Sequence, residues 1–154
     1  MSALVKYDSG WKGVLKEVLD RGGVFVTVGI QDYGDRKEED AELSNAEIAR
    51  LNEFGIGVPE RSFLRSTFDD NIEYFRKQAA SFTAGAVLGK WTPENAMALL
   101  GQRVVTKVKR KIRSNIPPGN AESTKARKKS SRTLIDTSQM LNAVDYQTGE
   151  RKND

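Results

Sequence analysis

The side chains of this chain that could do chemistry are carboxylates, lysines and hydroxyls, because its 154 residues include no His and no Cys. The missing His is the side chain whose ordinary pKa lies near neutrality, and the missing Cys supplies the thiolate nucleophile. Zinc sites depend on the same two residue types. The inventory therefore predicts a protein without enzymatic activity, and it gives no residue a catalytic, cofactor-binding or metal-binding role.

The densest group of carboxylates lies in the segment 31–43 and would suggest calcium. Its members are Asp32, Asp35, Glu38, Glu39, Asp40 and Glu42. The segment lacks the regular ligand positions, the central Gly and the closing Glu of an EF-hand, so we predict an exposed acidic loop. Asp69 and Asp70 are adjacent in a predicted helix, where neighbouring side chains point apart, which argues against a paired-carboxylate site.

Basic residues are concentrated in one part of the sequence. Residues 101–135 hold eleven Lys and Arg against one Glu, whereas residues 1–100 hold twelve against sixteen acidic residues. Two interpretations are open: a solvated helix face followed by a flexible loop, or a surface that contacts an acidic partner or nucleic acid phosphates. At the end of the predicted long helix the cations also complement the helix dipole.

The segment 116–133 is predicted to be a mobile basic loop, because residues 119–133 carry no large apolar side chain that could be buried. The cations expected to contact protein or DNA are Lys125, Arg127, Lys128, Lys129 and Arg132. No aromatic residue in this stretch could stack on a base. Any contact with nucleic acid is therefore expected to be weak, salt-sensitive and independent of sequence.

The first half of the chain predicts a helix over 9–21, a strand over 24–30 and a second short helix. In the strand, the alternate residues Val24, Val26, Val28 and Ile30 share one face. Ser44 and Glu47 form a capping box that opens the second helix. Its apolar face consists of Ile48, Leu51 and Phe54, with Phe54 as an apolar plug, and Gly55 ends it.

Two long amphipathic helices follow. The first covers residues 63–88, where spacings of three and four separate Leu64, Phe68, Ile72, Phe75, Ala79, Phe82 and Ala86. The second begins after Thr92 as N-cap, with Pro93 at its first position, and its apolar face consists of Met97, Leu100, Val104, Val108 and Ile112. The prolines near residue 117 end it. A short helix over 134–142 and a weak strand over 143–148 complete the chain.

These elements predict one α+β domain over residues 1–154: a small antiparallel sheet packed with two long helices and short capping helices, plus an extended basic loop. A lone strand needs a partner, because even a two-stranded hairpin is marginal in water. The partner of 24–30 is the C-terminal strand, a returning segment near 31–43, or a neighbouring subunit. The sequence shows no run of about 18 apolar residues and no leader pattern, which favours a cytoplasmic protein.

Three motifs carry more specific information than their chemistry explains. The first is Glu53-Phe54-Gly55 at a helix end. The second is Pro59-x-Arg61-x-Phe63-Leu64-Arg65 entering a long helix. The third is Leu134-Ile135-Asp136-Thr137-x-x-Met140 much later. In this order, and preceded by a strand ending at Ile30, they resemble the tail-component and virion-morphogenesis families of tailed bacteriophages, which comprise neck and tail-completion proteins. The resemblance covers about residues 24–148.

The resemblance implies a virion protein, made in the host cytoplasm, that forms a ring of six or twelve copies at the head–tail junction. It implies no cofactor, no membrane contact, and binding to neighbouring connector or tail proteins, with non-specific contact to DNA in the channel. Similar chains continue into a well-formed C-terminal strand, whereas this one ends in Gly149–Asp154, so its last strand is expected to be short or completed by another subunit.

The candidate protein-interface residues are those of the three motifs: Glu53, Phe54, Arg61, Phe63, Leu64, Arg65, Asp136 and Met140. Arg61 and Arg65 are expected to keep their guanidinium groups at the rim while Phe63 and Leu64 dock. Intrachain ion pairs with Glu53 or Glu60 are an equally weighted interpretation of the two arginines, and an N-cap is the simpler role of Asp136. The alternative function is a nucleic-acid-binding accessory protein that uses the basic segment 103–132.

Overall fold

The computed structural model describes residues 23–31, 43–121, 134 and 139–150. In chain order these residues form β1 (Val24–Ile30), α2 (Asn45–Phe54), α3 (Leu64–Val87), α4 (Pro93–Arg113), α6 (Gln139–Ala143) and β2 (Val144–Glu150). This arrangement is α+β, as predicted. The predicted helix over 9–21, the carboxylates of 32–42 and the basic residues of 125–132 lie outside the described residues.

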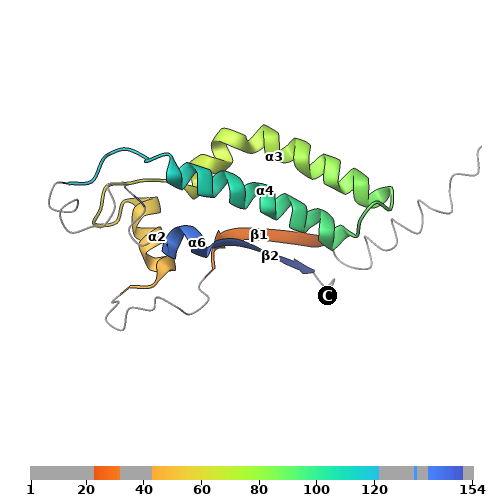
Figure 1. The fold of residues 1–154 in the computed structure, drawn as a ribbon, viewed down its shortest axis with the longest axis horizontal. Coiled ribbons are helices and arrows are strands. Elements are labelled where there is room, and N and C mark those ends of the chain that lie inside the picture. The colour runs from red at the N-terminus through yellow and green to blue at the C-terminus, as the bar shows by residue number, and fades with distance from the viewer. Residues whose placement is uncertain (1–22, 32–42, 122–133, 135–138, 151–154) are drawn as a thin grey trace, which may run out of the picture.

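Helix α4 is the central layer of the described fold. It packs against α3 on one side and against both strands on the other, and Figure 1 shows it between α3 and the sheet. Its apolar side chains Val104, Val108 and Ile112 are fully or almost fully buried. Thr92 caps the helix by accepting a hydrogen bond from the Asn95 backbone N–H, so the predicted start of this helix is confirmed.

The sheet consists of β1 and β2, paired antiparallel with Ile30 opposite Val144 and Val24 opposite Glu150. The C-terminal strand is thus the partner of β1, which confirms the first of the three predicted options. The expectation of a short last strand is wrong: β2 has seven residues, and each of them pairs with β1 of the same chain. The alternation in β1 is confirmed, because Phe25 and Thr27 are exposed while Val24, Val26, Val28 and Ile30 are partly buried.

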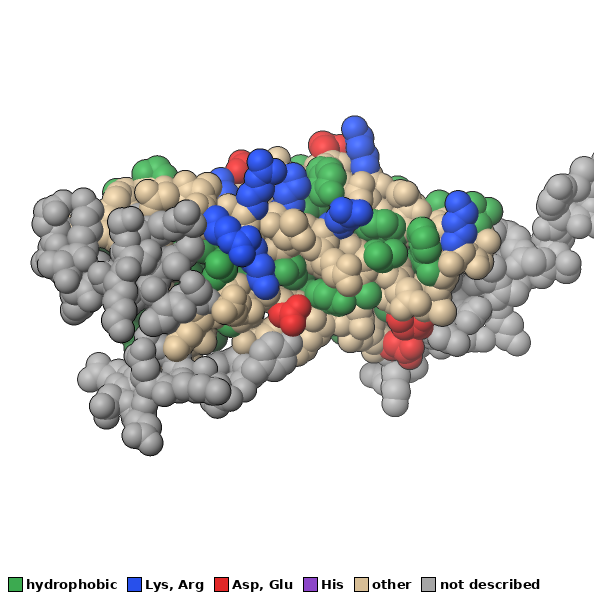
Figure 2. Space-filling view, viewed as in Figure 1, with side chains coloured by type: hydrophobic (Ala, Val, Ile, Leu, Met, Phe, Trp, Pro, Cys, Tyr) green, Lys and Arg blue, Asp and Glu red, His purple; other side chains and the backbone are tan. Residues whose placement is uncertain are grey.

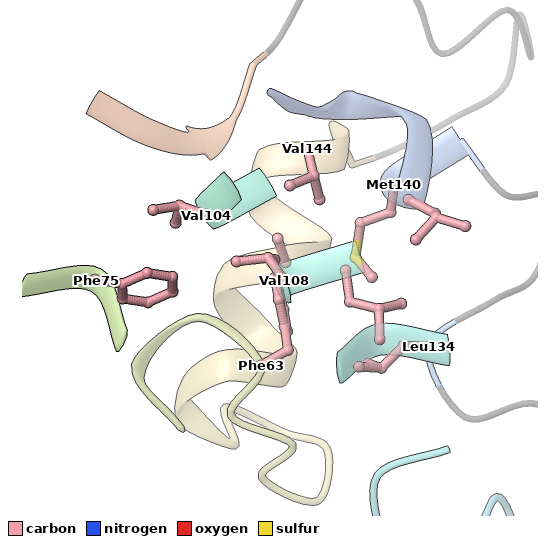
Figure 3. Packing of buried hydrophobic residues seen from close by; sticks show 10 residues of the cluster. Phe63, Phe75, Val104, Val108, Leu134, Met140 and Val144 are labelled. Carbon is pink, nitrogen blue, oxygen red and sulfur yellow. The ribbon is translucent and has the colours of Figure 1, made fainter. Parts of the chain in front are cut away.

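The core joins elements that are far apart in the sequence. Phe63, Val108, Ile112 and Val144 are completely buried, and they come from the start of α3, from α4 and from β2. Figure 3 shows Phe63 and Val108 close together, with Met140 and Val144 directed into the same cluster. Leu134 belongs to this cluster as well. The third sequence motif therefore contributes two side chains, Leu134 and Met140, to the interior of the subunit.

Helix α2 begins and ends as predicted, but its buried side differs. Ser44 and Glu47 form both hydrogen bonds of the capping box, and Gly55 takes the left-handed conformation that ends the helix. The buried residues, however, are Asn45, Ala49 and Glu53. Phe54 is 56% exposed, so the prediction that it is an apolar plug is wrong. Successive helix residues are about 100° apart, and burial of Glu53 turns Phe54 outward.

Helix α3 is not continuous in its geometry, which the apolar spacing did not predict. Asn71 has non-helical torsion angles (φ −127°, ψ 16°), and its side-chain amide donates to the Thr67 carbonyl oxygen at 2.9 Å. Phe75 is buried, whereas Phe68 and Ile72 of the same apolar stripe are 38% and 43% exposed. Helix α4 therefore covers only part of the stripe.

Two glycines of the long helices let aromatic rings approach the backbone. A Cβ atom at Gly85 would lie 2.5 Å from Trp91 Cζ2, and one at Gly101 would lie 2.6 Å from Tyr146 Cγ. The Trp91 indole is held in place because its Nε1–H donates to the Phe82 carbonyl oxygen at 2.9 Å. The contact of Gly85 with Trp91 positions the turn from α3 to α4. The contact of Gly101 with Tyr146 positions β2 against α4.

We predict that Gly85→Ala destabilises the protein by about 1–3 kcal/mol, because the Trp91 ring would have to leave its position. In a Trp91→Ala background the same change is expected to stabilise by up to about 1 kcal/mol, the normal gain for Gly→Ala in a helix. Urea unfolding of the two single variants and the double variant measures this reversal. An equal effect in both backgrounds would show that the ring does not impose the glycine.

A matched pair of phenylalanines tests where the core lies. Phe63→Ala, at a completely buried side chain, is expected to lower the free energy of unfolding by about 3–5 kcal/mol. Phe54→Ala, at a side chain that is 56% exposed, is expected to cost less than about 1 kcal/mol. Both values come from urea titrations of the full chain, and similar costs at the two positions would contradict the packing described above.

Candidate interaction site at the junction of α2 and α3

The carboxylate of Glu53 organises the junction between α2 and α3. Glu53 is only 4% exposed. Its oxygens accept hydrogen bonds from the backbone N–H groups of the next helix: Phe63 at 2.8 Å, Leu64 at 2.9 Å and Arg65 at 2.9 Å. The Ser62 hydroxyl donates a fourth bond at 2.7 Å. One buried carboxylate therefore accepts the donors that begin α3.

These hydrogen bonds cap the N-terminal end of α3. The first N–H groups of a helix have no acceptor within it, and Phe63, at the N-cap position, offers no side-chain cap. Glu53 supplies the acceptors from another helix, and its negative charge lies at the positive end of the α3 dipole. Burial by itself raises the pKa of Glu53, but the hydrogen bonds from Leu64, Arg65, Ser62 and Phe63 outweigh it and hold the pKa below the ordinary value.

Arg65 covers the outer side of this carboxylate. Its Nε lies 3.3 Å from Glu53 Oε1, and one terminal nitrogen lies 2.7 Å from Glu60 Oε1. Its guanidinium carbon is 4.9 Å from the centre of the Phe54 ring. The Arg65 side chain remains 52% exposed, as expected for a rim position. The predicted intrachain ion pairs with Glu53 and Glu60 are thus confirmed for Arg65.

Arg61 behaves differently from the prediction that it stays at the rim. It is 5% exposed, and burial lowers the pKa of its guanidinium below the ordinary value. Its Nε donates to the Pro118 carbonyl oxygen at 2.9 Å, and a terminal nitrogen donates to the Gly119 carbonyl oxygen at 3.3 Å. Arg61 therefore fastens the segment that follows α4 to the α2–α3 junction, and these carbonyl bonds are why it is drawn inward.

The turn after α2 presents apolar side chains outward. Phe54, Ile56 and Val58 are 56%, 46% and 37% exposed; we call these three residues the corner patch. The turn is tied back to α2, since the Ile56 N–H donates to the Leu51 carbonyl oxygen at 2.9 Å and the Arg61 N–H donates to the Asn52 carbonyl oxygen at 2.7 Å. The corner patch is therefore held on a hydrogen-bonded turn.

The predicted interface residues separate into two groups. Glu53, Arg61, Phe63 and Met140 are buried within the subunit, so they shape the junction and the core from inside. Phe54 and Arg65 are exposed and Leu64 is half-buried. Asp136 and the five cations of the predicted basic loop lie outside the described residues. The structure thus brings together the first two motifs, with Phe54 and Arg65 at the surface.

Sequence reasoning did not select Ile56 and Val58 for the interaction site. Both lie between the two motifs in a stretch with two glycines, and a connection of that kind is ordinarily polar. The two apolar residues in such a turn were the one sequence signal that could have indicated an exposed contact surface. Ser62 was also missed, because its hydroxyl bonds to Glu53, nine residues earlier, and only the folded chain brings the two side chains together.

Among the residues that the structure describes, no group of three or more acidic residues is placed to hold a metal ion. No helix within the same ranges is long and apolar enough to cross a membrane. Comparison of the chain with protein-family models, curated proteins and solved structures gives no match.

We predict that Glu53→Gln lowers the free energy of unfolding by about 2–3 kcal/mol at pH 7, because charged acceptors of buried bonds are lost. The folded-state pKa of Glu53 lies below its unfolded value of about 4.3. The advantage of the wild type over the variant is therefore full above about pH 5 and disappears as the pH falls through the folded-state pKa.

Urea titrations of both proteins between pH 7 and pH 3 measure this difference. Glu60→Gln is the matched control, since Glu60 is a 58% exposed carboxylate that also pairs with Arg65 and should cost less than about 1 kcal/mol. A Glu53→Gln effect that is equally small, or that does not change with pH, would contradict the capping role of Glu53.

Proposed function

We propose that this chain is a non-enzymatic structural subunit of a tailed-phage virion, a neck, collar or tail-completion protein that forms a ring by binding copies of itself. The ordered motifs support the proposal, and the main structural observation in its favour is the exposed corner patch. Single exposed apolar residues are common on protein surfaces. Three within five residues, on a turn held by hydrogen bonds, are a preorganised contact surface that loses little freedom on binding.

A ring needs two different surfaces on each subunit, because a head-to-tail interface joins one patch to another. The described residues offer a second apolar surface at the far end of α3: Val87 and Leu88 are 38% and 72% exposed, and we call them the tip patch. Helix α3 has 24 residues, about 36 Å of helix, so the two patches lie at opposite ends of the molecule (Figure 1).

We predict that native mass spectrometry of the full chain gives one closed species of six or twelve copies. Ile56→Asp in the corner patch and Leu88→Asp in the tip patch should each convert it to monomer, because a carboxylate would be buried in an apolar contact. Ile72→Asp is the matched control: Ile72 is 43% exposed but lies in neither patch, and this variant should still assemble.

A mixture of the two interface variants tests the head-to-tail arrangement. The Ile56→Asp subunit keeps an intact tip patch and the Leu88→Asp subunit keeps an intact corner patch, so the mixture should give a heterodimer and nothing larger. A strict monomer of the wild type at all concentrations would contradict self-assembly. Homodimers of either variant would contradict a contact between corner and tip.

A further inference from the structure

Helix α4 has a third side, turned away from both α3 and the sheet, and it is basic. Arg103, Arg110 and Arg113 are exposed and Lys109 is half-buried; these four residues are the basic face of α4. At about 100° per residue, they occupy one sector opposite the buried Val104, Val108 and Ile112. Figure 2 shows Lys and Arg side chains gathered over the C-terminal half of this helix.

The other two cations of this stretch have partners inside the molecule. Lys107 lies over the Tyr74 ring at 4.6 Å, and Lys111 pairs with Asp70 at 2.8 Å. No ion pair among the described residues involves any of the four residues of the basic face. Helix α4 also carries no acidic residue after Glu94. The positive charge of the face is therefore not neutralised within the described part of the subunit.

The helix dipole accounts for only part of this row. Cations in the last turn of a helix interact favourably with its C-terminal carbonyls, and the effect falls off within that turn. Arg110 and Arg113 are in the last turn. Arg103, however, lies ten residues before the end of α4, about 15 Å along the axis. The row is longer than stabilisation of the helix requires.

The composition of the face indicates which kind of partner it fits. The exposed side chains of α4 next to the cations are Gln102, which precedes Arg103, and Thr106, and α4 contains no aromatic residue. Interfaces between proteins are enriched in aromatic residues, Met and Arg and depleted in charged residues at their core, and this face has Arg but no aromatic residue and no Met. Contacts to phosphate oxygens, in contrast, come from Arg, Lys, Gln and Thr. Without aromatic rings the face offers no stacking for single-stranded bases, so a duplex backbone fits better.

We propose that the basic face of α4 binds the phosphate backbone of double-stranded nucleic acid without reading its sequence. A row of about 15 Å runs past about four phosphates of one strand, which are spaced about 3.4 Å along the duplex axis. Each neutralised phosphate releases counterions, so binding weakens as salt is raised. This activity does not depend on the ring proposal, because none of the four residues of the basic face belongs to either apolar patch.

The test is fluorescence anisotropy of the full chain with a 25-base-pair DNA duplex of arbitrary sequence, titrated at several salt concentrations. One variant replaces Arg103, Lys109, Arg110 and Arg113 by Gln. The matched control replaces four other exposed cations by Gln: Arg50, Arg76, Lys77 and Lys90. Both variants lose the same net charge. A third protein carries Gln at Lys125, Arg127, Lys128 and Arg132, which separates α4 from the later basic segment.

We expect the α4 variant to bind at least about tenfold more weakly at low salt, with the slope of log K against log salt reduced by about 3.6, or about 0.9 for each cation. The matched control should stay within about threefold of the wild type. Single variants Arg103→Gln and Arg110→Gln, which preserve the fold most safely, should each lower the slope by about 0.9. Native mass spectrometry of the α4 variant should still show the wild-type assembly state.

Three results would overturn the proposal. The first is equal duplex binding by the α4 variant and its matched control. The second is loss of binding only in the protein changed at residues 125–132. The third is a wild-type chain that does not bind duplex but binds polyglutamate, which would identify the partner of the face as an acidic protein.

Discussion

Hydrogen bonds to the buried carboxylate of Glu53 determine how helices α2 and α3 meet. The first N–H groups of α3 must find acceptors, and they find them on a side chain from the end of α2. This fixes the angle between the two helices and places Phe63 in the core. It also requires the turn between the helices to fold back tightly, which leaves Phe54, Ile56 and Val58 outside. The polar constraint inside the junction and the apolar surface outside it are thus two results of the same bond network.

Helix α4 connects the α2–α3 junction to the sheet, because it packs against α3 and against both strands. Two of its sides are covered, one by α3 and the other by the sheet, and the third carries the exposed cations. Arg61 adds a second tie, because its bonds to the carbonyls of Pro118 and Gly119 hold the chain after α4 against the α2–α3 junction. The beginning of α3 and the segment beyond α4 are therefore positioned together, and the three surfaces discussed above have fixed relative places: the corner patch, the tip patch and the basic face.

Local signals predicted the elements, because the interactions that make them are local. The capping box at Ser44 and the Thr92 cap with Pro93 lie within four residues of their partners, and alternation along β1 follows from the pleat. The interaction site depends on contacts that a pattern cannot contain. In the sequence Glu53 looks like an ordinary helix residue, because nothing in the local pattern indicates that the donors of residues 62–65 bond to it. Burial of that carboxylate decided the orientation of Phe54 against its own hydrophobicity, and the apolar spacing of α3 gave no sign of the break at Asn71.

The pairing of Phe25 with Gly149 bears on how the chain avoids mispairing its two strands. A Cβ atom at Gly149 would lie 2.6 Å from the Phe25 ring, so a side chain opposite this phenylalanine would require the ring to move. A sheet with one buried face can slip only by two residues without exposing that face. A slip of two residues in one direction would place Gln147 opposite the ring, which would then have to move. One ring and one missing side chain therefore favour the observed register over that competitor, at a strand end where no turn connects β1 to β2.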